Sequence, residues 1–185
     1  MVSIDPRISR RTVLAAAAFA PIVLGAQPLG VDAGFWSRPR QVWIRRQQSS
    51  EEIRVVYFAD GQVQWHGYAQ VCTVLRDLQA SKAAQIDLRL LDALCGAQGY
   101  LAAHGIQVPW VASSGYRTAR TNGMTEGAAR NSQHLRGCAT DGHFPGVSLK
   151  HQAALSRLYL QGGLGWYPSR GFIHLDTGVQ RVWRG

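Results

Sequence analysis

The sequence predicts an α+β domain built on a small antiparallel central sheet with flanking helices, and three observations support this fold class. The composition is that of a globular chain, since 46% of the 185 residues are hydrophobic and 17% are charged. Two β-rich runs surround Asp60-Gly61, which is a hairpin signal. Two helical patterns follow, and then short strands mixed with loops and one more helix. This order is typical of an α+β domain and not of βαβ repetition.

The first 26 residues have the order of an export signal and are left out of the fold. Arg10 and Arg11 precede an uncharged apolar run, as in twin-arginine signals. The run holds about a dozen residues, fewer than the ~20 that span a bilayer. We expect export to the periplasm by the twin-arginine route, and whether the signal is cleaved after Ala26 stays open. Contact with the membrane is expected only if the signal stays uncleaved.

Residues 27–40 are interpreted as a linker, and residues 41–185 as one domain. The hairpin at Asp60-Gly61 comes first, and helical spacing then covers residues 68–78. A second helix begins after Asp87 and ends at Gly105. Its apolar face is formed by Leu88, Leu91, Leu94 and Leu101.

Strands and a third helix complete the domain. Trp110-Val111 begins a strand that leads into Ser113-Ser114-Gly115-Tyr116-Arg117, a small-residue turn. Cys138-Ala139 begins a strand toward Asp141. Helical spacing over residues 149–160 is then interrupted by the glycine-rich residues 162–167, and residues 172–176 form the final strand.

The chain is basic, with a net charge of +9, and it stays basic without the first 26 residues. Its arginines gather in residues 38–46 and 170–184, where they could hold an anionic polymer or only keep the surface soluble. No basic helix or RNA-binding aromatic signature occurs, so we expect no nucleic-acid partner.

Three cysteines, Cys72, Cys95 and Cys138, lack the spacing of a zinc knuckle. Cys72 and Cys95 could pair in an oxidising compartment, but their apolar helical surroundings favour free thiols. Cys138 reads as a small packed residue beside a site.

The segment NSQHLRGCATDGHFPG, residues 131–146, carries ligands for a metal ion. His134 and Asp141 offer an imidazole nitrogen and a carboxylate oxygen, and Gly137 permits a tight turn between them. In GFIHLDTG, His174 and Asp176 share one face of a strand because side chains alternate. A catalytic zinc takes three protein ligands and keeps one place open, so His134, Asp141 and His174 predict one zinc ion.

A single histidine is more often a half-buried residue satisfied by hydrogen bonds than a metal ligand. We interpret four histidines in that way: His66, His104, His143 and His151.

Three motifs in this order resemble those of a known family. They are Ser114-Gly115-Tyr116-Arg117, Ser132-x-His134-x-x-Gly137-x-Ala139-x-Asp141, and His174-x-Asp176. They are similar to the zinc peptidases that cut bacterial cell-wall peptides, which include D-alanyl-D-alanine carboxypeptidases and murein endopeptidases and have hedgehog domains as distant relatives. SGYRT, NSQH and GLGWYPSRGFIHLDTG most resemble exported murein endopeptidases that cleave peptidoglycan cross-links. The resemblance covers about residues 41–185 and implies a hedgehog/D,D-peptidase-like fold.

The resemblance also implies roles for residues. His134, Asp141 and His174 would bind one Zn²⁺, Arg117 would lie near the substrate carbonyl, and Ser132 near the ligands. Tyr116 and Tyr167 are further candidates for contact with peptidoglycan peptides, Tyr116 because the small-residue turn sets it at the lip of the site. Tyr167, in an aromatic loop with Trp166, would line an open groove for a cross-linked polymer.

One position departs from many relatives, which have an acidic residue as general base three positions before the third ligand. This chain has Gly171 there. Asp176 is the nearest carboxylate by strand geometry, and it could accept the proton or orient a zinc-binding imidazole. It could also cap the end of the strand.

The expected function is therefore a periplasmic zinc-dependent peptidoglycan peptidase, and two other classes stay open. Gly171 favours a catalytically weak or inactive zinc-bearing module that binds the cell wall. A wall-anchoring protein without metal is disfavoured, because nothing would maintain all three metal-binding residues in a protein that no longer binds metal. The bond that is cut stays open as well: D-Ala to diaminopimelate, diaminopimelate to diaminopimelate, or a carboxy-terminal D-Ala.

Overall fold

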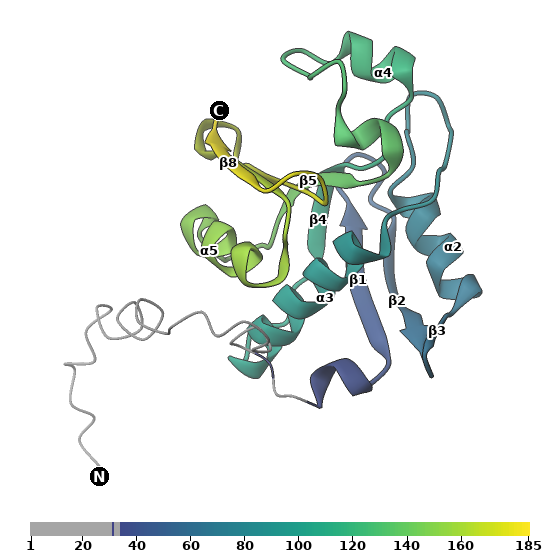
Figure 1. Cartoon of the computed structure of the whole chain (residues 1–185), viewed down its shortest axis with the longest axis vertical. Helices are drawn as coiled ribbons and strands as arrows, with labels where there is room; N and C mark the ends of the chain where they lie inside the picture. The colour runs from purple at the N-terminus through teal and green to yellow at the C-terminus, as the bar shows by residue number, and fades with distance from the viewer. Residues whose placement is uncertain (1–30, 32–33) are drawn as a thin grey trace, which may run out of the picture.

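The structure is a computed structural model that describes residue 31 and residues 34–185. The predicted export signal at residues 1–26 lies outside these residues, as do residues 27–30 and 32–33 of the predicted linker. The described part contains eight strands, four α-helices and three short 3-10 helices (Figure 1). In chain order they are η1 (Phe35–Ser37), β1 (Arg40–Arg46), β2 (Glu52–Ala59), β3 (Gln62–Val63), α2 (Trp65–Val74), α3 (Leu88–Ala103), β4 (Trp110–Ser114), α4 (Ala119–Met124), η2 (Gln133–Arg136), β5 (Ala139–His143), α5 (Leu149–Tyr159), β6 (Gly163–Tyr167), η3 (Pro168–Arg170), β7 (Phe172–Asp176) and β8 (Arg181–Arg184).

The α+β class is confirmed, but the sheet is larger than predicted and is mixed. Its strand order is β3-β2-β1-β4-β5-β7-β6-β8. The pairs β1·β4 and β6·β8 are parallel, and every other neighbouring pair is antiparallel. The prediction of a small antiparallel sheet is therefore wrong in size and in strand direction.

The sheet is larger because three strands carry weak sequence signals. β1 and β8 are rich in arginine, and β6 lies in the segment that the sequence presents as a glycine-rich break before a final strand. The glycines of β6 have a packing reason, because a Cβ at Gly165 would lie 2.7 Å from the Trp183 ring. The glycines of β6 thus leave room for β8 side chains. They also weaken the β-strand signal in the sequence, because glycine is uncommon within strands.

The predicted hairpin and the helix after Asp87 are confirmed. Asp60 and Gly61 both have positive φ angles, 53° and 74°, as a tight two-residue hairpin turn requires. The Asp87 side chain accepts a hydrogen bond from the Arg89 N–H at the start of α3. Gly105, with φ of 77°, follows the end of this helix.

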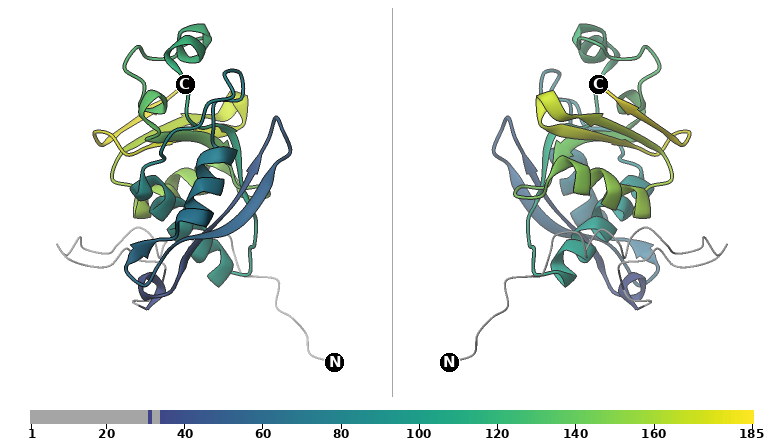
Figure 2. Two further views of the ribbon diagram at one scale, coloured as in Figure 1. Left: turned by 90° about the vertical axis from the view of Figure 1, so that its right-hand side faces the viewer. Right: turned by 90° about the vertical axis from the view of Figure 1, so that its left-hand side faces the viewer.

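The helices pack against the sheet around one hydrophobic core. α2 contacts β1 and β2, α3 contacts β1 and α5, and α5 contacts β6 and β7. Figure 2 shows these helices beside the sheet from two opposite sides. Ile173 and Leu175 of β7 belong to this core. Because side chains alternate along a strand, His174 and Asp176 point to the other face of the sheet.

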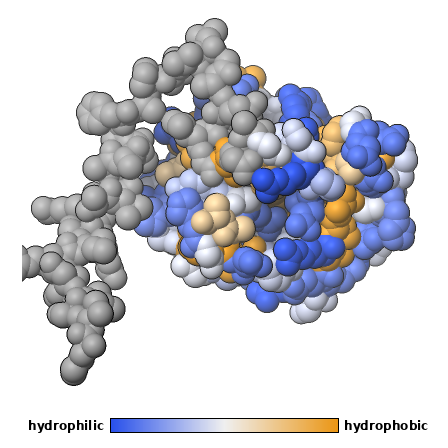
Figure 3. Space-filling view, turned by 90° about the horizontal axis from the view of Figure 1, so that it is seen from below, coloured by the Kyte–Doolittle hydropathy of each residue, from blue (hydrophilic) through white to orange (hydrophobic). Residues whose placement is uncertain are grey.

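No helix among the described residues combines the length and the apolar character needed to cross a bilayer. On the face shown in Figure 3, hydrophobic side chains form separate patches among hydrophilic ones.

Candidate metal centre and substrate groove

His134, Asp141 and His174 come together in one buried cluster. Each offers a ligand atom, and these atoms all lie within 4.8 Å of one another. His134 Nε2 lies 3.2 Å from His174 Nδ1 and 3.3 Å from Asp141 Oδ1. His174 Nδ1 lies 2.7 Å from the same Asp141 oxygen. The three atoms form a small triangle on the sheet face opposite the helices.

Strand pairing and one turn position the three side chains. Asp141 on β5 and His174 on β7 are direct cross-strand partners, so their side chains lie next to each other. His134 lies in η2, which begins after Ser132 and ends at Gly137, where φ is 67°. A Cβ at Gly137 would also collide with the Gln85 carbonyl, so glycine is needed there for conformation and for space.

Each imidazole has an outer nitrogen, which points away from the cluster and already has a hydrogen-bond partner. Its inner nitrogen points into the cluster and is available to bind a metal. His134 Nδ1 donates to the Gly115 carbonyl at 2.6 Å, and His174 Nε2 donates to Asp176 Oδ2 at 2.8 Å. Three acceptor atoms then converge and repel one another unless a proton or a cation lies among them. Ligand atoms bound to one zinc at about 2.0 Å stand about 3.3 Å apart, close to the longer sides of this triangle. The residues therefore suit a zinc ion.

The charges in the cluster are strongly coupled. Burial lowers the pKa of His134 and favours the neutral imidazole that binds metals. Burial alone would raise the pKa of Asp141, but its contacts with His134 and His174 outweigh this effect and lower the pKa. Burial likewise opposes the charged form of His174, yet hydrogen bonds to Asp141 and Asp176 raise its pKa. The lowered pKa keeps the Asp141 carboxylate ionised between the two imidazoles at neutral pH.

Asp176 lies behind His174 and has no exposed surface. Besides His174, it accepts hydrogen bonds from the Gly163 and Gly178 backbone and from Arg181, whose Nη2 lies 2.7 Å away. A carboxylate that accepts from the outer nitrogen of a ligand histidine fixes the orientation of the ring. The geometry favours this role for Asp176 over proton transfer to or from a substrate.

Arg117 and Ser132 flank the cluster. Arg117 Nη2 donates to Asp141 Oδ2 at 2.5 Å, and its Nε donates to Ser114 Oγ at 2.8 Å. Ser132 Oγ accepts from the His134 backbone N–H at 3.3 Å at the start of η2. Arg117 is thus fixed at Asp141 Oδ2, and Ser132 supports the turn that carries His134.

Two adjoining cavities, of about 600 and 340 Å³, meet at the cluster. They share Arg117, Asp141 and Phe172, among other residues. Tyr116 lines the larger cavity, whereas His134, His174, Ser132 and Tyr167 line the smaller one. We name the two cavities together the substrate groove. Tyr167 stacks on Phe172 with ring centres 4.6 Å apart, and its hydroxyl accepts from Trp183 Nε1 at 2.8 Å.

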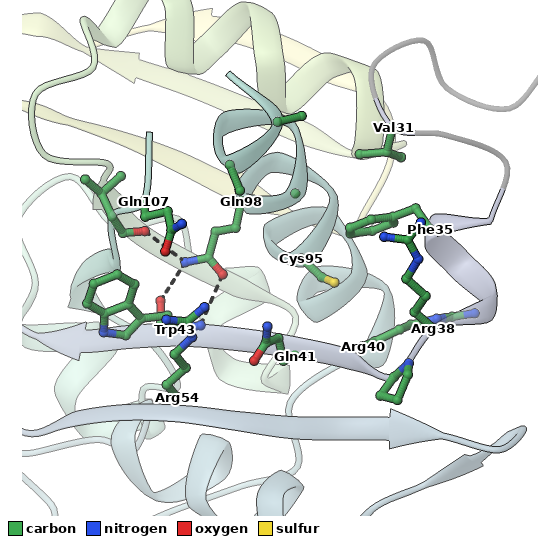
Figure 4. Close-up of a pocket in the computed structure, with 15 residues that line it drawn as sticks. Val31, Phe35, Arg38, Arg40, Gln41, Trp43, Arg54, Cys95, Gln98 and Gln107 are labelled. Atoms are coloured by element: carbon green, nitrogen blue, oxygen red, sulfur yellow. Dashed lines mark hydrogen bonds between the residues drawn. The ribbon is translucent and has the colours of Figure 1, made fainter. Parts of the chain in front are cut away.

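Another cavity of about 600 Å³ lies between β1, α3 and η1 (Figure 4). Its main polar groups serve the fold: the Gln98 amide bonds to the Trp43 backbone and to the Val108 carbonyl. Arg40 is paired with Asp92 at 3.0 Å. None of the lining residues belongs to the predicted site, so this cavity is not the candidate active site.

The remaining histidines and cysteines lie outside the cluster. The interpretation as half-buried residues fits His143, whereas His66, His104 and His151 are exposed. Cys72, Cys95 and Cys138 are free thiols, as expected for the first two from their helical surroundings. Cys138 makes only weak contacts, such as 3.5 Å from Sγ to the Arg136 carbonyl.

Sequence reasoning missed three residues around the site. Arg181 holds Asp176, and Trp183 lies against the His174 ring at 5.2 Å between centres. Arg46, treated as part of a basic surface cluster, is only 5% exposed and lines the larger cavity. Arg46 follows Val42 and Ile44 at intervals of two residues on β1, and this pattern could have predicted that its side chain is buried with theirs.

Comparison with known proteins places the chain among cell-wall enzymes. The family described as peptidoglycan L,D-endopeptidase MepK matches residues 36–183. A peptidoglycan L,D-endopeptidase MepK of Escherichia coli K12 is 36% identical over 157 residues, which cover 79% of this chain and 81% of that protein. A probable peptidoglycan L,D-endopeptidase MepK of Haemophilus influenzae is 33% identical over 116 residues, 60% of this chain and 61% of that protein. No solved structure matches the chain.

Proposed function

Because the chain belongs to the peptidoglycan L,D-endopeptidase MepK family, we propose that it hydrolyses L,D-peptide bonds in peptidoglycan with one zinc ion held by His134, Asp141 and His174. The observation that carries the zinc assignment is the triangle of converging acceptor atoms, each oriented by a neighbour. A zinc ion supplies a Lewis acid that polarises the carbonyl of the cleaved bond and activates water.

The residues of the chain hold the site and the substrate. Gly115 and Asp176 fix the two imidazoles, so that Nε2 of His134 and Nδ1 of His174 face inward. Arg117, in both cavities of the groove, is positioned to oppose negative charge that develops on the carbonyl oxygen. Tyr167 and Phe172 offer a stacked apolar wall for the peptide.

Periplasmic action is part of the proposal and rests on the paired arginines before the apolar run in residues 1–26. Peptidoglycan lies outside the cytoplasmic membrane, so an enzyme that cuts it requires export. The same signal leaves membrane attachment to depend on cleavage after Ala26.

Mass spectrometry of defined muropeptides that carry L,D-linked cross-links tests the proposal. The zinc-loaded protein, with about one zinc per chain, should release the two separated peptides, and a chelator should stop the reaction. His134→Ala and His174→Ala should each lose zinc and activity. A zinc-loaded protein that binds these peptides without cutting them would instead support the zinc-bearing binding module, which the glycine at position 171 favours.

A further inference from the structure

The larger cavity of the substrate groove contains a buried cation that the fold does not use. Arg46 ends β1, on the same inward face as Val42 and Ile44, and is 5% exposed. Its Nε and Nη1 are buried and have no hydrogen-bond partner among the described residues. A buried, unpaired guanidinium is costly, because burying a charge without a partner forfeits its hydration.

The protein groups around Arg46 are engaged elsewhere. Glu51, just before β2, pairs with Arg76 at 3.0 Å. Asp141 pairs with Arg117, and Asp77 accepts from the Thr118 backbone N–H and hydroxyl. Arg40 at the other end of β1 shows the contrast: its Nε also has no partner, but its Nη1 donates to both oxygens of Asp92. The cavity therefore contains a guanidinium that an anionic ligand could pair with.

Arg46 is charged at neutral pH in spite of its surroundings. Burial and the nearby Arg76 and Arg117 outweigh the opposite effect of Glu51 and Asp141 and lower the pKa of Arg46 to about 10, which still leaves the guanidinium protonated. The guanidinium of Arg46 thus offers a positive charge and free N–H donors at a site with little water. A carboxylate binds a planar guanidinium through paired hydrogen bonds.

We propose that Arg46 binds the free α-carboxylate of the D-configured residue on the amine side of the cleaved bond. Arg46 would thereby determine specificity for L,D-peptides in which this carboxylate is free. This inference rests on the proposed function. The carboxyl carbon of that residue lies within about 4 Å of the cleaved carbonyl carbon, by bond lengths alone. Arg46 lines the cavity that also contains Asp141 and Arg117, at the side of the metal ligands. Arg117 is already held by Asp141 and Ser114, and Arg170, the third arginine of this cavity, is exposed and lies over the Tyr167 and Phe172 rings. Arg46 is therefore the buried guanidinium of this cavity with free donors.

The backbone at this position does not depend on the side chain, so variants should fold. The Arg46 N–H donates to the Glu51 carbonyl at 2.7 Å, and its carbonyl accepts from the Ser50 N–H at 2.9 Å. Arg46→Met should melt at or above the wild-type temperature, because an unpaired buried charge is removed. Arg46→Lys, which keeps a charge without the planar fork, is the second variant.

The test compares two L,D-peptides that differ only in this group, one with a free carboxylate and one with a carboxamide. The zinc-loaded wild type should prefer the carboxylate peptide in kcat/KM by about 10- to 100-fold, the scale of a hydrogen-bonded charge. In Arg46→Met the preference should fall to near one, with Arg46→Lys in between. Arg45→Met, which removes the exposed neighbour on the opposite face of β1, should keep the full preference. Retention of the preference in Arg46→Met, or a large fall in its melting temperature, would overturn the inference.

A binding measurement separates this inference from the proposed function. In the metal-free protein, which cannot cut, the carboxylate peptide should raise the melting temperature of the wild type and of Arg45→Met but not that of Arg46→Met. If the zinc-loaded wild type cuts neither peptide, the proposed function fails while this shift still decides the role of Arg46. An equal shift in wild type and Arg46→Met would reject the carboxylate site even if the enzyme is active.

Discussion

His174 shows how one side chain connects two carboxylates with different tasks. Its inner nitrogen faces Asp141, and its outer nitrogen donates to Asp176. The sequence predicts that His174 and Asp176 share a strand face, because they are two residues apart. It cannot tell which carboxylate faces the proposed metal position, since that depends on Arg181, Gly163 and Gly178, which surround Asp176 and close it off from solvent.

Asp176→Asn should therefore weaken zinc binding by about 10- to 100-fold, because the orientation and basicity of the His174 ring are lost. Turnover should recover when zinc is added in excess. Competition with a chromophoric chelator gives the affinity, and assays at several zinc concentrations give the recovery. Unchanged affinity with turnover reduced by roughly 10²-fold at saturating zinc would make Asp176 the general base instead.

The connections between elements are as important to the site as the strands themselves. The turn after β4 approaches the loop after α2 so closely that a Cβ at Gly115 would collide with the Leu75 carbonyl and lie 2.8 Å from the Leu75 Cβ. The Gly115 carbonyl holds His134 Nδ1. The sequence indicates a small-residue turn before Arg117, but the tight contact with residue 75 is a tertiary feature that local patterns do not contain.

Gly115→Ala should lower the free energy of unfolding by about 1–3 kcal/mol, the usual cost of overpacking, and should reduce zinc affinity because the carbonyl that holds His134 moves. Urea denaturation and zinc competition measure the two effects. Gly123→Ala in α4 is the control, because a Cβ there meets nothing within 4 Å. It should be neutral or slightly stabilising, as alanine is in a helix. Equal effects of the two substitutions would contradict the packing explanation.

Asp77 fastens the loop after α2 to the start of α4. Burial alone would raise its pKa, but hydrogen bonds from Thr121, Thr118 and Ala80 outweigh burial and lower the pKa to about 2. A carboxyl whose pKa is lower in the folded state stabilises the protein above its unfolded pKa of about 3.9 and loses this contribution as the pH falls toward 2. The contribution is about 2 kcal/mol.

Asp77→Asn should thus lower stability near neutral pH by about that amount, and the difference from wild type should shrink between about pH 4 and pH 2. Thermal or urea unfolding across this range measures the difference. Asp60→Asn, in the exposed hairpin turn, should follow the wild-type curve. A difference from wild type that is independent of pH would show that Asp77 acts by packing and not by its charge.

At the scale of the molecule, the sequence predicts the α+β class, the hairpin and the helix after Asp87, because these depend on local periodicity and turn residues. The mixed eight-stranded sheet could not be predicted, since β1 and β8 consist largely of arginine and aromatic residues and pair in parallel with strands that do not follow or precede them directly in the chain. The three proposed ligands were found because their residue types are chemically unusual. Arg46 was not found, because an arginine is assumed to be exposed until its strand is known.

Export concerns the whole molecule, and the paired arginines give its test. Replacing Arg10 and Arg11 by lysine keeps the charge but should leave the protein in the cytoplasm, because twin-arginine signals are read by a receptor. Cell fractionation with immunodetection measures the distribution. Periplasmic protein at the wild-type level in the lysine variant would point to another export route.

The pairing of Asp141 with His174 across β5 and β7 also makes the site a reporter of refolding. A slip of β7 by one residue would turn His174 to the core face and take it away from both partners. Cobalt(II), which is coloured when bound in tetrahedral sites, should therefore develop its absorption only after these strands have reached the native register. Stopped-flow refolding in the presence of cobalt would time that single step apart from the general collapse of the chain.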